Sequence, residues 1–349
     1  MAPISKRGSS TRVSGAPAVA LADRYADGYE RRFGELGEPP HHVVKERVVA
    51  ARESLWHRLG AIWDARDLLV FLVRKEVKVR YKDSALGFLW SMLNPALMLT
   101  VYYFVFKAIG RGGIPHFALF LFTGIIPWNL YLSGLLGATG SVVGNGGLVK
   151  KVSFPREILP LSTVGSALVF FFFQCIVLVL ALGIFGFTPA FAYLPLVVLA
   201  LVTLLVFTGA FGMLLSALNV YLRDVQHLVE VALMAWFWSI PIVYSFQTMA
   251  PHLSKYHLTW LYLANPVTPV VLTFQRALYA HVSYPAVAAK AASHGRPAVA
   301  AQAALQVLPA HGWEWYLFIL LGLLAASLVL FIIAMVVFGR VEGNFAEEL

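Results

Sequence analysis

Charged side chains are scarce along this chain. They make up 13% of its 349 residues, whereas 59% of the residues are hydrophobic. A soluble domain carries about 25% charged residues, and the mean hydropathy here is +0.73. Several apolar runs approach or exceed the roughly 20 residues that cross a bilayer as a helix. These proportions exclude an ordinary soluble protein and predict an all-α polytopic membrane protein.

Cysteine, metal-ligand patterns and nucleotide motifs are also scarce. The single cysteine, Cys175, lies inside an apolar run, which rules out an intrachain disulfide. The ten histidines show no metal-ligand spacing. The stretch 137–147, GATGSVVGNGG, lacks the Gly-Lys-Ser/Thr ending of a phosphate loop and follows an apolar run instead of a strand. We therefore expect no metal, cofactor or nucleotide on this chain itself.

Ionisable residues are missing from two places where certain functions need them. None lies in the middle of a predicted span, although ion-coupled transporters usually rely on such groups or on unwound helices. Between Phe246 and Trp313 there is no Asp or Glu, and a membrane enzyme acting there would ordinarily need a carboxylate. The first absence disfavours a self-powered transporter. The second disfavours an enzyme of polymer assembly, which stays a minor alternative.

The short-loop charges orient six predicted spans. Lys150, Lys151, Arg223 and Arg340 fall on the same face as the basic segment before the first span. Because positive short loops mark the cytoplasmic side, both termini are expected to be cytoplasmic. The spans are predicted at Leu86–Ile109, Phe117–Val142, Leu159–Phe185, Tyr193–Tyr221, Leu228–Phe246 and Trp313–Phe338.

The chain before the first span divides into a polar tail and amphipathic segments. Residues 1–50 are predicted to be a disordered cytoplasmic tail. Residues 51–85 are predicted to form amphipathic interfacial helices, because Trp56, Leu59 and Trp63 recur at helical spacing among charges. The basic cluster that follows either anchors on anionic headgroups or forms a cytoplasmic entrance for an anionic substrate, and both can hold. The entrance residues are Arg80, Tyr81 and Lys82.

The membrane domain, 86–349, contains a long predicted outer loop at 247–312. Its first half, about Tyr262–Ala280, is interrupted by prolines and is expected to be re-entrant or interfacial instead of crossing. Its second half, 285–310, is rich in alanine and is interpreted as an insertion without chemistry of its own. A seventh span in this loop would move the C-terminus to the other side.

One predicted cytoplasmic loop, NGGLVKKVSFPREIL at 145–159, alternates apolar and charged residues. A short helix presenting Phe154 beside charges would fit a groove on a partner protein. A simple connector along the membrane surface is the other interpretation. The candidate docking residues are Lys150, Lys151, Phe154, Pro155, Arg156 and Glu157.

Seven short stretches follow one another in a specific order. They are RYKDSALGFLWSMLNPAL, the Pro127-Trp128 pair, LVKKVSFPREILPLS, YLRDV, SIPIVY, NPVTP and the tail EGNFAEEL. Each is modest alone, but their order and spacing resemble those of the permease subunit of bacterial polysaccharide ABC exporters, over about Leu55–Leu349.

The resemblance implies export of a lipid-linked O-antigen, teichoic acid or galactan across the bacterial cytoplasmic membrane. It implies a permease homodimer with two copies of a separate ABC ATPase, which would bind ATP and Mg²⁺, and no nucleic acid partner. The docking loop would be the coupling helix that touches the ATPase, and the segment before the first span would be a gate helix. The N-terminal tail and the insertion depart from this pattern. A drug or small-lipid ABC exporter permease is the alternative.

Aromatic residues bear on such a substrate. Trp128, Trp236 and Trp238 fall mid-span, where an interfacial belt does not explain them. They either pack helices together or line a conduit, since aromatic faces offer a flat apolar surface to sugar C–H groups. The candidate conduit residues are Tyr102, Tyr103, Phe106, Trp128, Tyr131, Trp236 and Trp238.

The predicted outer face carries cations against a single acid, Glu314. A polymer on a lipid pyrophosphate is anionic at its lipid end, and arginine binds phosphate through two parallel hydrogen bonds. Arg111 and Arg276, beside apolar segments, are the candidate outer phosphate contacts. The alternative is that they are surface charges that contribute little individually.

Overall fold

A computed structural model describes residues 55–80, 82, 84, 86, 89–109, 116–279, 308, 309 and 311–349. Helices, turns and irregular segments make up this part of the chain, and it contains no strand. The predicted tail lies outside the described residues, as does the predicted insertion except for residues 308 and 309.

Four of the described helices are long and apolar enough to cross a membrane. They are α5 (Phe117–Gly144), α7 (Ile158–Ile184), α8 (Leu194–Tyr221, preceded by the 3₁₀ turn η2, Phe191–Tyr193) and α15 (Trp313–Val341, continued by η4, Glu342–Asn344). They coincide with four of the predicted spans. The prediction of an all-helical polytopic membrane protein is therefore confirmed.

Two further helices correspond to the other predicted spans. Helix α4 covers Trp90–Ile109, and α9 covers Val225–Trp238. The 14 residues of α9 extend about 21 Å, less than the hydrocarbon thickness of about 30 Å. The helix ends at Trp238 instead of Phe246 because residues 239–245 form turns around Pro241, which cannot donate a helical hydrogen bond.

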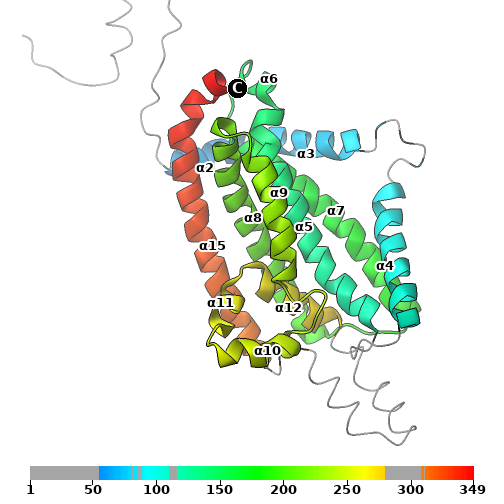
Figure 1. Ribbon diagram of the computed structural model, residues 1–349. Helices are drawn as coiled ribbons and strands as arrows, with labels where there is room; N and C mark the ends of the chain where they lie inside the picture. Colours follow the sequence, from blue (N-terminus) through cyan, green and yellow to red (C-terminus); the bar gives the residue numbers. More distant parts are fainter. Residues whose placement is uncertain are drawn as a thin grey trace, which may run out of the picture. The chain divides into compact units, whose positions relative to one another are not determined.

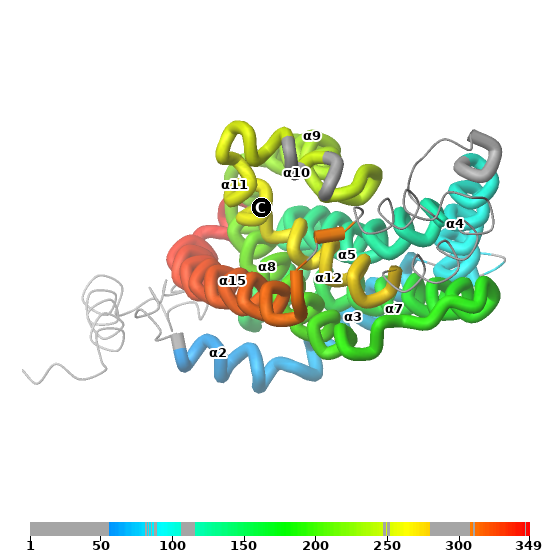
Figure 2. The backbone as a smooth tube through the Cα atoms, turned by 90° about the horizontal axis from the view of Figure 1, so that it is seen from below, coloured from blue at the N-terminus to red at the C-terminus, as the bar shows by residue number. Residues whose placement is uncertain are grey.

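Helix α5 lies at the centre of the fold. Most of its side chains are buried, and it packs against α7 and α8 along its length. In both views α5 and α8 lie between α15 and α4 (Figures 1 and 2). The backbones of α5 and α8 approach closely at Gly212, where an added Cβ would lie 2.6 Å from the Cβ of Ala138. Small residues commonly permit such contacts between membrane helices.

The segment before α15 forms three short helices: α10 (Phe246–Lys255), α11 (Thr259–Ala264) and α12 (Val267–Leu278). Helix α12 is almost entirely buried, between α5, α8 and α15. Its 12 residues extend about 18 Å, too short to cross a bilayer. The predicted re-entrant or interfacial segment is thus a short helix inserted among the longer ones. It lies toward the end of the fold opposite the C-terminus (Figure 1).

The end of the fold that carries the C-terminus gathers several segments. Helices α2 (Leu55–Asp64) and α3 (Arg66–Arg80) run across the long helices there, beside α6 (Gly146–Val149) and α16 (Phe345–Glu348) (Figure 1). Trp56 and Trp63 on α2 are exposed, whereas Leu72 of α3 is buried, and α3 packs against α7. The helices expected from Leu55 onward are present, and the two tryptophans face outward.

Candidate coupling surface and substrate cleft

The predicted docking loop follows α6 and has two unlike halves. Lys150, Lys151 and Val152 are exposed, and half of the Val152 side chain is accessible. In the second half, Phe154 packs against a buried apolar cluster and Glu157 is only 2% exposed. Pro155 and Arg156, between them, are half-buried. The first half is therefore accessible, while the second half anchors the loop to the fold.

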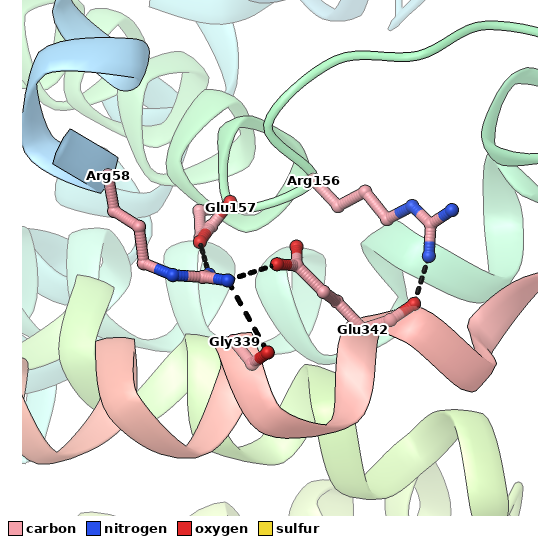
Figure 3. A network of polar contacts seen from close by, with 5 residues as sticks. All are labelled: Arg58, Arg156, Glu157, Gly339 and Glu342. Atoms are coloured by element: carbon pink, nitrogen blue, oxygen red, sulfur yellow. Dashed lines mark hydrogen bonds and ion pairs between the residues drawn. The ribbon is translucent and has the colours of Figure 1, made fainter. Parts of the chain in front are cut away.

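Arg58 of α2 joins this anchored half to the end of α15 (Figure 3). Its Nη1 donates to Oε1 of Glu157 at 2.7 Å, and its Nη2 donates to Oε1 of Glu342 at 2.5 Å. Nη2 also donates to the backbone oxygen of Gly339 at 3.4 Å. The planar guanidinium fork suits such a shared role, because it presents several donors in fixed directions. One side chain thus holds three segments that are far apart in the sequence.

The surroundings of Arg58 keep its guanidinium protonated. Its side chain is 12% exposed, and burial by itself lowers its pKa, but the hydrogen bond to Glu342 and the charges of Glu342 and Glu157 raise the pKa above its usual value. A Cβ at Gly339 would overlap the guanidinium. A side chain at this position would therefore displace the guanidinium from its place against α15.

The last residues of the chain complete this arrangement. Arg156 Nη1 donates to the backbone oxygen of Glu342. The Phe345 ring is fully buried and contacts the rings of Phe338 and Tyr221. The side chain of Leu349 packs near Gly146 of α6. The C-terminal segment thus contacts the chain on both sides of the exposed half of the docking loop, at Gly146 and at Arg156.

A second candidate site is a cavity of about 300 Å³ between α4, α5, α7 and α9. Arg80 from the predicted entrance and Tyr102 and Trp128 from the predicted conduit all line it. The Arg80 guanidinium lies 4.4 Å from the centroid of the Phe170 ring, a cation–π distance. We call this cavity the polar cleft. Its lining residues come from five helices, since Arg80 belongs to α3.

Other predicted conduit residues lie outside the polar cleft. Tyr131 is fully buried, and its ring packs at a tilt against Trp128 and edge-on against Trp236 in an aromatic core. Trp236 also donates its Nε1–H to Oδ1 of Asn265, which links α9 to the start of α12. Trp238 is 65% exposed at the end of α9. Packing explains Tyr131 and Trp236, as the alternative interpretation of these aromatics expected.

The remaining predicted site residues are placed as follows. Tyr103 lines a different, apolar groove between α4 and α7. Lys82 is exposed. Tyr81, Arg111 and the side chain of Phe106 lie outside the described residues.

Arg276, a candidate phosphate contact, lies near the C-terminal end of α12. Its guanidinium is 5.2 Å from the centroid of the Tyr193 ring, and that ring packs against Tyr316. Its Nε is buried without a hydrogen-bond partner in the described part of the chain. The aromatic rings hold the arginine in place while part of its donor capacity is unused.

Sequence reasoning missed the roles of Arg58 and Glu342. The one local feature that could have indicated the ion pair was Glu342 itself, an acidic residue close after a long apolar run, in the tail motif EGNFAEEL. Its partner is 284 residues away along the chain, and no local pattern identifies such a pair.

Residues 67–279 match the ABC-2 type transporter family, and the chain belongs to this family. It is 34% identical to the O-antigen export system permease protein RfbA of Klebsiella pneumoniae over 219 residues, which cover 63% of this chain and 82% of that protein. The RfbA protein of Myxococcus xanthus is 34% identical over 223 residues, covering 63% of this chain and 83% of that one. The polysialic acid transport protein KpsM of Escherichia coli is 28% identical over 95 residues, 27% of this chain and 35% of KpsM. The family resemblance seen in the motifs is confirmed.

Replacing Arg58 by alanine is expected to destabilise the protein markedly. The change leaves Glu157 buried without its partner, and removing one member of a buried ion pair typically costs about 3–5 kcal/mol. The apparent Tm of the purified protein in detergent measures the effect. Arg66→Ala, at an exposed position on the next helix, is the control and should leave the Tm nearly unchanged. Equal Tm values for both variants would show that the network does not hold the fold together.

Proposed function

We propose that the protein is the permease subunit of an ATP-driven exporter that moves a lipid-linked polysaccharide across the bacterial cytoplasmic membrane. The observation that carries this proposal is the 34% identity to O-antigen export permeases over more than four fifths of their length. The polar cleft supports a sugar-bearing substrate, because amide, arginine and aromatic side chains line it. O-antigen, galactan and teichoic acid are the candidate polymer classes.

A drug or small-lipid exporter is the second candidate function. It would use an apolar pocket, and a groove of about 580 Å³ between α4 and α7 has this character. Met92, Leu99 and Phe185 are among its lining residues. An apolar groove at a membrane helix also accommodates ordinary lipid chains, so it supports this alternative less than the polar cleft supports a glycan.

The proposed topology has six spans, with α4 and α9 added to the four long helices, and both termini in the cytoplasm. The end of the fold that carries the C-terminus also carries the basic segments. Arg74 on α3, Lys150 and Lys151 after α6, Arg223 between α8 and α9, and Arg340 near the end of α15 all lie in segments at that end. Positive charge marks the cytoplasmic side.

In this scheme the permease works as a homodimer with two copies of a separate ABC ATPase, which binds ATP and Mg²⁺ and hydrolyses the nucleotide. The exposed half of the docking loop, Lys150–Val152, touches the ATPase. The anchored half transmits the conformational change of the ATPase to the permease. Glu157 directly precedes α7 and is linked to α2 and α15 through Arg58. Arg80 and Lys82 gather the anionic pyrophosphate, and Tyr102 and Trp128 form one wall for the sugars.

Deleting the gene in its source bacterium tests the proposed function. Lipid-linked glycan should accumulate inside the cell and surface polysaccharide should disappear, because synthesis continues while export stops. Expression of the wild-type chain should reverse both effects. The measurements are lectin or antibody labelling of intact cells and mass spectrometry of extracted lipid-linked glycan. Normal surface polysaccharide in the deletion strain, together with altered drug or lipid efflux, would establish the second candidate function instead.

Charge reversal in the exposed half of the loop tests coupling. The double variant Lys151→Glu, Val152→Asp should keep its Tm but lower export at least about tenfold, because mismatched charges at an interface cost several kcal/mol. ATP hydrolysis by the partner should lose its response to substrate. Lys255→Glu, exposed on α10 near the opposite end, is the matched control and should export normally. Normal export and ATPase activity in the loop variant would mean that the loop is only a connector.

Arg276 is proposed to receive the phosphate group as the polymer leaves. Lysine keeps the charge but cannot form two parallel hydrogen bonds to phosphate. Arg276→Lys should therefore slow export severalfold at matched protein levels and unchanged Tm, whereas Lys255→Gln should not. Export by Arg276→Lys at the wild-type rate would contradict a specific contact between Arg276 and the phosphate group. Arg111 is proposed to act in the same way.

A further inference from the structure

Two amide side chains meet inside the polar cleft. Asn129 of α5 donates its Nδ2–H to Oε1 of Gln174 on α7, at 2.8 Å. Both side chains are half-buried, and both line the cavity of about 300 Å³. That volume is at the lower end of the range of about 300–1,000 Å³ for small-molecule sites. Neither residue was predicted as a site residue from the sequence.

The hydrogen bond between the two amides uses only part of their capacity. A primary amide has two N–H donors and a carbonyl with two lone pairs. Gln174 Nε2 and Asn129 Oδ1 have no further partner among the described residues, and neither atom is fully enclosed. Donors and an acceptor thus remain available on two side chains that line the cavity. A pair that only fastened α5 to α7 would not need a cavity beside it.

The walls of the cavity indicate what these groups would contact. Trp90, Tyr102 and Trp128 contribute aromatic surface, and Asn94 contributes a further amide from α4. A sugar ring has apolar C–H faces and hydroxyl groups that both donate and accept. An apolar drug would leave the remaining donors and acceptors of the amides without partners, which is unfavourable for groups shielded from water. The combination of lining groups therefore fits a carbohydrate better than an apolar compound.

We propose that Asn129 and Gln174 form a hydroxyl-recognition pair that determines which sugar unit the polar cleft accepts. This inference rests on the proposed glycan-export function and names the specificity-determining residues of its cleft. Sites that hydrogen-bond a substrate hydroxyl strongly reject analogues that lack it, because the protein groups are then left unpaired. The pair would thus favour glycans that present a hydroxyl toward both amides.

Two double variants separate recognition from a purely structural bond. Asn129→Leu with Gln174→Leu removes the amides. Asn129→Gln with Gln174→Asn exchanges them, which keeps an interhelical hydrogen bond but moves it toward α7 by about one methylene group. Thr203→Val on α8 is the control, because the Thr203 hydroxyl bonds within its own helix and does not line the cleft.

The binding probe is a set of oligosaccharides released by mild acid from the surface polysaccharide of the source bacterium, with maltotetraose as the unrelated sugar. Binding to the purified permease is followed by tryptophan fluorescence, and export is followed in the complemented deletion strain. We expect both double variants to bind the released oligosaccharides at least about tenfold more weakly than wild type, a modest part of the discrimination that hydroxyl-binding sites reach. Export should fall in parallel, the exchanged pair should keep the wild-type Tm, and Thr203→Val should match wild type throughout.

Wild-type binding and export in the exchanged variant, with defects confined to a less stable leucine variant, would reduce the pair to a structural bond and overturn the inference. Equal binding of maltotetraose and the released oligosaccharides by the wild type would also overturn it, since no selectivity would exist to explain. These outcomes differ from failure of the proposed function, in which the wild-type chain itself does not restore polysaccharide export.

Discussion

The fold depends on one buried arginine shared by two carboxylates. Arg58 forms ion pairs with both Glu157 and Glu342, and all three side chains are largely shielded from water. Because a buried charge without a partner is strongly unfavourable, the three segments are constrained to stay together. Helix α2, the start of α7 and the end of α15 therefore form one unit at the end of the fold that carries the C-terminus. The anchored half of the docking loop is therefore linked by Glu157 and Arg156 to α2 and to the end of α15.

That unit is connected to the polar cleft through α3. Helix α3 runs from the Arg58 unit along α7 to Arg80, which lines the polar cleft. The cleft itself is formed where α4 stands beside the tightly packed pair α5 and α7. Asn129 and Gln174 lie on two helices that pack closely against each other, and a hydrogen bond joins their amides in the cleft.

Much of this architecture follows from local sequence signals. Runs of apolar residues identify the four long helices, and alternating apolar and charged residues identify α2 and the docking loop. The early end of α9 has a local signal in Pro241, which the span prediction did not use. The burial of α12 was not predictable, because it depends on contacts with distant helices. Of the conduit aromatics, Tyr102 and Trp128 line the cleft while Tyr131 packs in the core. Composition cannot separate these cases, since which side of a buried helix faces a cavity is decided by tertiary packing.

The most direct test of this account asks which end of the permease meets its energy source. A photo-crosslinking amino acid at position 152, in the exposed half of the loop, should form an adduct with an ABC ATPase in native membranes. The same amino acid at position 256, exposed after α10 near the opposite end, should not. An ATPase adduct at 256, or its absence at 152 with the ATPase present in the same membranes, would contradict the account.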